Sequence, residues 1–368
     1  MIILKCPRDT LLSPLQAVSG IVEKRHTLPI LSNVLLEKQG ERLTLLATDI
    51  EIQITTESSP ISGEGEGAVT LAAKKLQDIL RSLPESAEIT LDKEDKRLLL
   101  KAGKSRFSLQ TLPADDFPRM VIAEGDEKTL AVTQKEFRAL IGKTQYAMAS
   151  QDVRYYLNGL MLMVDGQELR CVATDSHRLA YNSMAIDSSL EHQEMILPKK
   201  TVLELNRLLS DNDEPLRISV GGNQIRFAFG ATVLVSKLID GKFPDYERVI
   251  PSHLENRMTV NRQALHTAMS RAAILTNDKF HGVRILLDAN LLKIIAANAE
   301  QEEAQEEIEV QYTGAPLDIG FNVTYLLDVF NNLSGDDIEW SFNDANSSAL
   351  ITVPGNDRFK YVVMPMRI

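Results

Sequence analysis

The sequence has 368 residues, of which 44% are hydrophobic, 25% charged and 5% aromatic. This composition fits a globular protein of roughly two to three domains and excludes a wholly disordered chain. The formal net charge is −11, from 40 basic and 51 acidic residues. Taken over the whole chain, that balance disfavours a nucleic-acid-binding protein.

Membrane and secretion signals are missing from the sequence. No stretch reaches about 18 consecutive apolar residues, the length of a membrane-spanning helix, and the first residues lack the pattern of a signal peptide. The two cysteines, Cys6 and Cys171, lie far apart and have no metal-binding or redox spacing. We therefore expect a cytoplasmic protein with two reduced, buried thiols.

Helix-like and strand-like segments alternate along the chain in a regular order. Apolar periodicity predicts helices at 10–22, 72–82, 134–149, 199–209, 261–275 and 323–333. Thr133 and Asn261 are N-cap residue types at the start of two of them. Between the helices, segments of period two such as 106–112 predict antiparallel strands.

An internal repeat accounts for this order. The sequence LTLLATD at 43–49 recurs as LRCVATD at 169–175 and as LKIIAAN at 292–298. Other short matches follow at the same spacing, among them DFP at 116–118 and KFP at 242–244. Such a repeat indicates copies of one structural unit. We predict an α+β fold of three similar domains, 1–127, 128–255 and 256–368, each with two helices packed on antiparallel sheets.

Positive charge is concentrated in the predicted helices, although the chain as a whole is acidic. Five of the six carry more basic than acidic residues, whereas 322–333 has Asp328 as its one charged residue. For a single helix, an ordinary solvated face explains this equally well. Five together suggest a surface that attracts phosphate. Because no recognition helix, zinc motif or aromatic RNA platform is evident, we expect contacts to the nucleic-acid backbone without base readout.

Three segments resemble catalytic or ligand motifs but do not support one. Asp175, Ser176 and His177 are adjacent in sequence, whereas catalytic triads are assembled from separate parts of a chain. The glycine-rich run 63–67 contains acid and lacks the lysine of a phosphate loop. The acidic run 301–307 is more typical of a solvated face or a protein interface than of a cation site. We expect no enzymatic activity, no metal and no cofactor.

The chain resembles the bacterial DNA polymerase III β subunit family, the sliding clamps, over nearly its whole length. The resemblance is carried by TLPIL at 27–31, SRFSL at 105–109, QDVRYYLNG at 151–159, ATDSHRLA at 173–180, GKFPDY at 241–246, IGFNV at 319–323 and YVVMPMRI at 361–368. It implies the DNA clamp fold and a head-to-tail homodimer that forms a ring of six domains. The implied function is that of a non-enzymatic processivity factor, which encircles duplex DNA and tethers the replicative polymerase through a peptide-binding pocket.

Simple geometry is compatible with such a ring. Two chains would place twelve helices around the hole, and a spacing of ~10 Å between axes leaves a bore of ~28 Å. A duplex ~20 Å across passes through with water around it. Two alternatives remain open at this point: a DNA repair or recombination enzyme on a repeat scaffold, and a peptide-docking scaffold unrelated to DNA.

The resemblance also assigns residues to three sites. DNA contacts are implied at Arg25, Lys74, Gln151, Tyr155 and Tyr156, and the charge of the helices adds Lys199, Lys200 and Arg207. The pocket for short linear peptides comprises Leu157, Thr174, His177, Arg178, Leu179, Pro244, Arg248, Val249, Asn322, Tyr325, Ser348, Val362, Val363, Met364, Pro365 and Met366. Its implied partners are the DNA polymerase III α subunit, the clamp loader, other DNA polymerases and repair proteins.

At the dimer interface, the resemblance implies an apolar centre flanked by charges. Phe107 and Leu109 are expected to meet Ile274 and Leu275 of the partner chain. On one side of this centre the flanking residues are basic, namely Lys75, Lys104 and Arg106. They are expected to face the acidic residues Glu300, Glu303 and Glu306 of the partner chain. Arg271 is a further residue of the interface.

Two positions depart from the family pattern near the pocket. Asn346 stands where an aliphatic residue is common, so the rim of the pocket is expected to differ. Ser176 replaces a common glycine, a change from which we expect little consequence.

Overall fold

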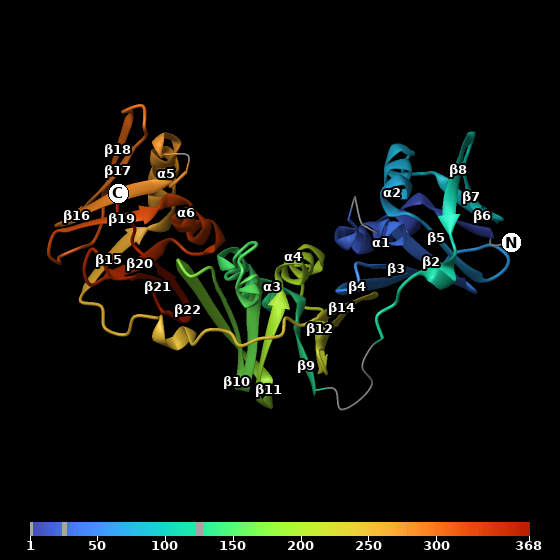
Figure 1. Ribbon diagram of the computed structural model, residues 1–368, viewed down its shortest axis with the longest axis horizontal. Coiled ribbons are helices and arrows are strands. Elements are labelled where there is room, and N and C mark those ends of the chain that lie inside the picture. The colour runs from blue at the N-terminus through green and yellow to red at the C-terminus, as the bar shows by residue number, and fades with distance from the viewer. Residues whose placement is uncertain (1–2, 24–27, 122–127, 278) are drawn as a thin grey trace. The chain divides into compact units, whose positions relative to one another are not determined.

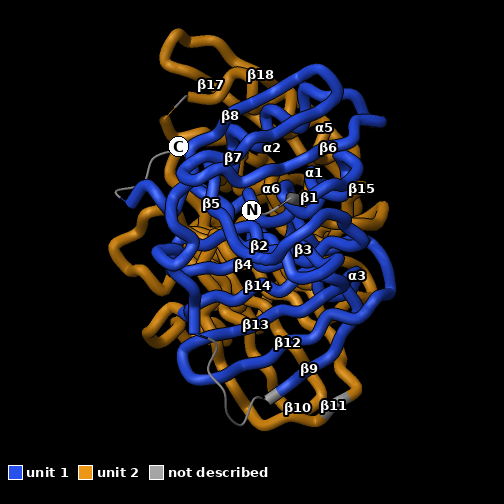
Figure 2. The backbone as a smooth tube through the Cα atoms, turned by 90° about the vertical axis from the view of Figure 1, so that its right-hand side faces the viewer, with its two compact units in different colours: residues 1–137, 203–238 blue, residues 138–202, 239–368 orange. Residues whose placement is uncertain are grey.

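The computed structural model describes residues 3–23, 28–121, 128–277 and 279–368. The chain divides into two compact units, which Figure 2 shows in blue and orange. The first unit comprises Met1–Phe137 and Leu203–Leu238, and the second comprises Arg138–Val202 and Ile239–Ile368. Among the described helices, none is long and apolar enough to cross a membrane.

The first unit is built on one twelve-stranded sheet with the order β1-β6-β7-β8-β5-β2-β3-β4-β14-β13-β12-β9. All neighbouring strands in it are antiparallel. Its elements are β1 (Ile3–Pro7), α1 (Arg8–Val18), β2 (Asn33–Gln39), β3 (Arg42–Thr48), β4 (Ile52–Ser58), β5 (Gly67–Ala72), α2 (Ala73–Ser82), β6 (Glu88–Glu94), β7 (Arg97–Ala102), β8 (Ser105–Leu112), β9 (Lys128–Thr133), β12 (Pro215–Gly221), β13 (Gln224–Phe229) and β14 (Thr232–Lys237). Helices α1 and α2 pack against each other beside this sheet (Figure 1).

The second unit contains two sheets, of order β10-β11-β22-β21-β20-β15 and β18-β17-β16-β19. Its elements are β10 (Gly159–Thr174), β11 (Arg178–Pro198), β15 (Asn256–Asn261), α5 (Arg262–Ala272), β16 (Gly282–Asp288), β17 (Leu291–Ala297), β18 (Glu303–Glu309), β19 (Leu317–Asn322), α6 (Val323–Asn332), β20 (Asp337–Phe342), β21 (Ala349–Val353) and β22 (Asn356–Val363). Helices α5 and α6 also pack as a pair. Two more helices, α3 (Gln134–Gly142) and α4 (Lys199–Leu208), have residues in both units.

All six predicted helices are present, and their start signals act as expected. The Thr133 hydroxyl accepts the Glu136 N–H at 3.2 Å, and the Glu136 carboxylate accepts the Thr133 N–H at 3.1 Å, a capping box. Asn261 accepts the Ala264 N–H at 3.0 Å and caps α5. The predicted segment 134–149 is longer than the helix, because α3 ends at Gly142 and the chain continues through a short 3-10 turn, Gln145–Ala147.

The same kind of strand pair joins successive repeats in both units. In the first unit β4 pairs with β14, with Ile52 opposite Ser236. In the second unit the start of β11 pairs with β22, with Arg178 opposite Val363. In both junctions, the strand that follows the repeated segment ending in Thr-Asp pairs with the last strand of the next repeat. The internal repeat in the sequence therefore appears in the fold as one recurring sheet junction.

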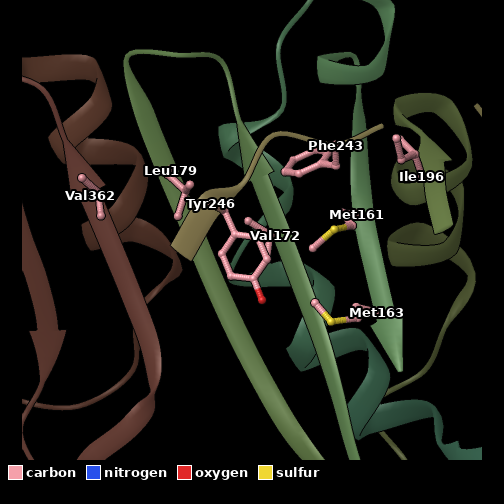
Figure 3. Packing of buried hydrophobic residues seen from close by; sticks show 8 residues of the cluster. All are labelled: Met161, Met163, Val172, Leu179, Ile196, Phe243, Tyr246 and Val362. Atoms are coloured by element: carbon pink, nitrogen blue, oxygen red, sulfur yellow. The ribbon is translucent and has the colours of Figure 1, made fainter. Parts of the chain in front are cut away.

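The segment 239–250 packs across the six-stranded sheet of the second unit. Phe243 and Tyr246 are 4% and 6% exposed, and they contact apolar side chains of β10, β11 and β22 (Figure 3). Met161 and Val172 are among these partners, both at most 1% exposed. This packing fixes the segment on the sheet, beside the end of the sheet where the candidate groove lies.

Candidate peptide groove and DNA-contact residues

A groove of about 190 Å³ lies in the second unit. Its walls come from the turn between β10 and β11, the segment 239–250 and the end of β22. The lining residues are Thr174, Ser176, His177, Arg178, Leu179, Pro244, Tyr246, Val249, Val362 and Met364. Eight of these ten were predicted for the peptide pocket, and Ser176 and Tyr246 are additions.

The floor of the groove is rigid and apolar, whereas two of its walls lie outside the sheet. Leu179 and Val362 are directly opposite each other on β11 and β22 and are 2% and 1% exposed. Pro244 belongs to the segment 239–250, and Met364, 46% exposed, follows β22. An apolar floor with few polar groups and one flexible methionine suits short peptides of differing sequence.

The Asp-Ser-His sequence beside the groove forms a turn. The Thr174 hydroxyl donates to the Arg178 carbonyl at 2.6 Å, and the Asp175 carboxylate accepts the N–H groups of His177 and Arg178 at 3.0 and 3.1 Å. Because Asp175 is bonded to backbone amides and to arginine, it does not orient His177 as in a catalytic triad.

The same turn occurs in the first unit, where the Thr48 hydroxyl donates to the Ile52 carbonyl at 2.8 Å. There the Asp49 carboxylate accepts the N–H groups of Glu51 and Ile52 at 3.0 and 2.8 Å. The repeated Ala-Thr-Asp motif thus encodes a turn that precedes each junction strand.

Ser176 has a left-handed backbone conformation, with φ of 76°. Its counterpart in the first unit, Ile50, has φ of 70°. Residues other than glycine, asparagine and aspartate rarely adopt this region. The backbone at this position favours glycine, so we now expect serine to lower stability here, where the sequence suggested little consequence.

Arg178 is the central charged residue of the groove, and its side chain is 9% exposed. Its guanidinium donates to Asp175 at 3.1 Å, to Asp328 at 2.6 Å and to the Tyr146 carbonyl at 2.6 Å. It also lies 4.3 Å from the centre of the Tyr325 ring. Burial opposes its charge, but the Tyr361 phenol oxygen and the carboxylates of Asp328 and Asp175 together keep its pKa above the ordinary value.

Asp328 was missed among the site residues in the sequence-based prediction. It lies on α6, 150 residues from Arg178. The signal was present in the charge count, since Asp328 is the one charged residue of the predicted helix that broke the basic pattern. A carboxylate alone on an otherwise uncharged helix indicates a specific cationic partner.

Half of the sixteen predicted pocket residues lie outside the groove lining. Leu157 and Val363 are buried, and Asn322 caps α6 by accepting the Thr324 N–H at 2.9 Å. Arg248 is paired with Asp245 at 2.8 Å and its side chain is 87% exposed. The remaining four are Tyr325, whose ring stacks on Arg178, and the half-buried Ser348, Pro365 and Met366.

Asn346, which departs from the family pattern, also lies outside the groove lining. Its N–H donates to the Asp344 carboxylate at 2.7 Å.

The predicted DNA-contact residues fall on α2, on the loop 150–158 and on α4. Lys74 is exposed on α2, opposite the buried Leu76 and Leu80. Tyr155 is 58% exposed, and its ring meets that of Tyr156 edge-on, with 6.0 Å between centroids. Arg25 lies outside the described residues.

Internal hydrogen bonds hold the loop 150–158 in place. The Asn158 side chain accepts the Asp152 N–H at 2.9 Å and donates to the Asp152 carbonyl at 2.8 Å. Hydrogen bonds from Arg154 lower the pKa of Asp152 to about 2. Gln151, at the start of the loop, has φ of 56°. The loop is therefore a preorganised support for Tyr155.

Lys199 and Arg207, added from the helix charges, donate hydrogen bonds within the protein. Lys199 donates to the Ser150 hydroxyl at 2.6 Å and to the Ala149 carbonyl at 3.2 Å, and burial lowers its pKa. Arg207 donates to the Ala17 carbonyl at 2.8 Å and to Glu204 at 2.9 Å. Lys200 is half-buried on α4.

Several residues predicted for the dimer interface are exposed on the surface of their unit. Ile274 is 77% exposed and Leu275 is half-buried, directly after α5. Glu306 already has a partner in the same chain, because the Arg271 guanidinium donates to it at 2.7 Å.

In the first unit, Leu109 and Lys75 line a hollow of about 480 Å³ beside β8. Phe107 is half-buried, and the remaining predicted charges are exposed: Lys104, Arg106, Glu300 and Glu303.

Comparisons with known proteins agree over the whole chain. Family models of the DNA polymerase III beta subunit match in three parts, its N-terminal domain at 2–121, its central domain at 131–245 and its C-terminal domain at 247–367. The beta sliding clamp of Pseudomonas putida is 49% identical over 363 residues, and that of Escherichia coli is 46% identical over 361 residues, each covering 98% of both chains.

Solved structures give the same result. The crystal structure of the sliding clamp from Pseudomonas aeruginosa bound to griselimycin has a TM-score of 0.95 and 47% identity over all of both chains. The griselimycin-bound clamp of Bartonella birtlesii also has a TM-score of 0.95, at 36% identity. By sequence and by fold, the chain belongs to the DNA polymerase III beta subunit family, the sliding clamps.

Proposed function

We propose that this sliding clamp works as a head-to-tail homodimer that closes around duplex DNA and holds its partners by the groove at Arg178. In this proposal each chain contributes three domains, 1–127, 128–255 and 256–368, and acts in the cytoplasm as a tether without catalytic activity. The observation that carries it is the recurring sheet junction, which occurs twice among the described strands and leaves the edges of two further strands without the partner that this pattern gives their counterparts.

The unpaired edges belong to β18 and β8. Among the described strands, β18 pairs only with β17, although the corresponding strands of the other repeats each have a second neighbour. β8 pairs with β7 along its length, but with β5 only at Thr111 and Leu112. A third junction of the same kind therefore needs β18 of one chain and β8 of another.

The register of the internal junctions fixes how these edges would meet. β18 corresponds to β4, and β8 corresponds to β14. Matched through their hairpin partners, Gln53 opposite Val235 predicts Glu303 opposite Ser108 of the partner chain. Further along, Glu307 would lie opposite Lys104. Acidic and basic edges attract each other and disfavour pairing of like edges. Each exposed pair adds only about 0–1 kcal/mol, so the charges would set register more than strength.

Retention on DNA would come from closure of the ring. Positive helices attract phosphates weakly, which permits sliding, while topology prevents release. The test is to load the protein on nicked circular DNA and then to linearise the circle. We expect the protein to remain on the circle and to run off the linear form. Equal retention on both forms would show direct binding and would contradict encirclement.

The groove would bind short linear motifs of the polymerase α subunit, the clamp loader, other polymerases and repair proteins. Its floor of Leu179 and Val362 is buried, and a few such anchors carry most of the energy of peptide grooves. Deleting Met364–Ile368 removes the wall at Met364, so we expect it to abolish binding of a polymerase-derived peptide in calorimetric titration.

Gel filtration of the same variant is the control, since the proposed dimer edges lie elsewhere in the chain. A dimer that retains full peptide affinity would place the binding site outside the groove. Leu203→Ala is the matched control variant, because Leu203 is 48% exposed and outside the groove lining.

A further inference from the structure

Two glycines in neighbouring strands of the second unit are not required by their backbone. Gly282 is the first residue of β16, and Gly320 lies within β19. Neither has a positive φ. Glycine within a strand is destabilising relative to alanine and often marks close approach of another chain segment. The approaching segment here is Met364–Ile368, which we call the tail.

The tail crosses both glycines. A Cβ atom at Gly320 would lie 2.5 Å from the Met366 carbonyl oxygen and 2.7 Å from Cδ1 of Ile368. At Gly282, a Cβ atom would lie 3.3 Å from both Cδ1 and Cγ1 of Ile368. The two positions therefore form a shallow slot, with Gly320 under the tail backbone and Gly282 under the Ile368 side chain.

Two backbone hydrogen bonds hold the tail, at its first and third residues. The Met364 N–H donates to the His177 carbonyl at 2.9 Å, and the Met366 N–H donates to the Gly320 carbonyl at 2.8 Å. Met364, whose N–H makes the first of these bonds, forms part of the groove wall. The second bond, two residues further along, attaches the tail to β19, outside the groove lining, and so contributes to the position of Met364.

We propose that Gly282 and Gly320 are positioning residues for the peptide groove: they seat the tail and thereby hold Met364 in the wall. This proposal rests on the proposed function of the groove. It explains the IGFNV motif at 319–323 with a specific role for its glycine. Neither glycine would touch the bound peptide.

An added methyl group at Gly320 would displace the tail before it displaces the sheet. β19 is bonded to β16 along six consecutive residue pairs, whereas the tail makes the two backbone bonds above to the rest of the described chain. Without the tail, alanine would suit the strand better than glycine. Gly320→Ala should therefore leave the unit folded and weaken the groove.

The experiment uses the full-length dimer and a polymerase-derived peptide in calorimetric titration. We expect Gly320→Ala to weaken binding roughly tenfold, and Gly282→Ala, whose Cβ meets the flexible side chains of Ile368 and Met366 and no backbone atom of the tail, to weaken it less. Hydrogen exchange at the Met366 amide is the second readout, and Gly320→Ala should make it faster. Leu291→Ala, at a 38% exposed residue on the opposite end of the same sheet, is the control for folding of that unit.

A variant that lacks Arg367 and Ile368 adds a test of coupling. Because its tail has already lost the side chain over the slot, Gly282→Ala should have little further effect in that background. Wild-type affinity and unchanged Met366 exchange in Gly320→Ala would overturn the proposal. If the wild type itself failed to bind the peptide, the proposed function of the groove would fail instead, and the exchange measurement would still decide whether the slot seats the tail.

Discussion

Ser176 combines a strained backbone with a place in the groove. Its φ of 76° is held by the turn, in which its N–H donates to the Thr174 hydroxyl at 3.1 Å. Glycine removes the steric conflict between Cβ and the backbone but adds freedom to the unfolded chain. In a left-handed conformation the backbone strain is the larger of the two effects. Its removal should therefore outweigh the added freedom of the unfolded chain.

We predict that Ser176→Gly stabilises the protein by about 0.5–1 kcal/mol. Thermal denaturation followed by circular dichroism measures the change. Ser347→Gly, at a half-buried serine that is not among the left-handed residues, is the matched control and should destabilise. A lower melting temperature for Ser176→Gly would mean that the hydroxyl contributes more than the strain costs.

The two cysteines are buried, with Cys6 2% and Cys171 0% exposed. Burial, with the Glu88 carboxylate adding to it, raises the pKa of Cys6 to about 12. Burial also raises the pKa of Cys171 above its ordinary value. Both thiols are therefore neutral at physiological pH, and only the thiolate is nucleophilic.

We predict that neither cysteine reacts with a disulfide-exchange reagent at pH 8 in the folded protein and that both react in concentrated urea. A raised pKa also means that Cys6 favours the folded state below the unfolded thiol pKa of about 9. This contribution is lost as the pH rises toward about 12. Rapid labelling of the native protein at pH 8 would contradict the burial of these thiols.

Arg207 shows why a charged helix residue is not necessarily a ligand contact. Its guanidinium donates to the carbonyls of Gln16 and Ala17, near the end of α1, where carbonyl groups lack helical partners. Glu204 lies on the other side of the guanidinium and offsets its charge. The side chain therefore serves the attachment of α1.

We predict that Arg207→Met lowers the free energy of unfolding by about 1 kcal/mol and leaves the salt dependence of DNA binding unchanged. Lys74→Met should do the reverse, reducing the salt slope by about one with little effect on stability. Thermal denaturation and fluorescence anisotropy with duplex DNA measure the two properties. If Arg207→Met reduced the slope as Lys74→Met does, Arg207 would contact phosphate.

The elements could be predicted from the sequence because their signals are local. Thr133 and Asn261 begin helices where expected, and the buried face of α2 follows its apolar spacing. The attachment of Lys199 to Ser150 could not be predicted, since it depends on how a loop folds back over a helix. For the same reason, the pair of Arg178 and Asp328 was missed, although both residues carried informative charge.

At the scale of the whole molecule, the proposed interface between chains depends on a small apolar centre. Ile274 and Leu275 follow α5, which packs on β17 and β18. A carboxylate placed among apolar groups without a partner costs several kcal/mol, comparable with the surplus that holds an interface together.

We predict that Leu275→Asp produces monomers at micromolar concentration in sedimentation velocity. Ile274→Asp is the companion variant, because Ile274 is 77% exposed and a charge there does not perturb the fold of the single chain. Circular dichroism of both variants should match the wild type. A folded Leu275→Asp variant that remained dimeric would mean that the apolar centre lies elsewhere.

Whole-molecule organisation was predictable to the extent that it repeats. The matches between 43–49, 169–175 and 292–298 indicated copies of one unit, and the structure places the same Thr-Asp turn at the first two. The pairing of β4 with β14 and of β11 with β22 was not visible in the sequence, because strand neighbours are set by tertiary packing. The ring itself was supplied by resemblance.

In the proposed ring, the recurring junction has a consequence for how long the protein stays on DNA. Within a chain, peptide segments also connect successive repeats, and buried rings such as Phe117 and Phe243 hold these segments on the sheets. A junction between two chains has strand pairing and side-chain contacts but no covalent connection. The two intermolecular junctions are then the sites at which the ring opens. The lifetime on a closed circle is set by the rate at which either junction opens, and it is independent of the affinity for DNA.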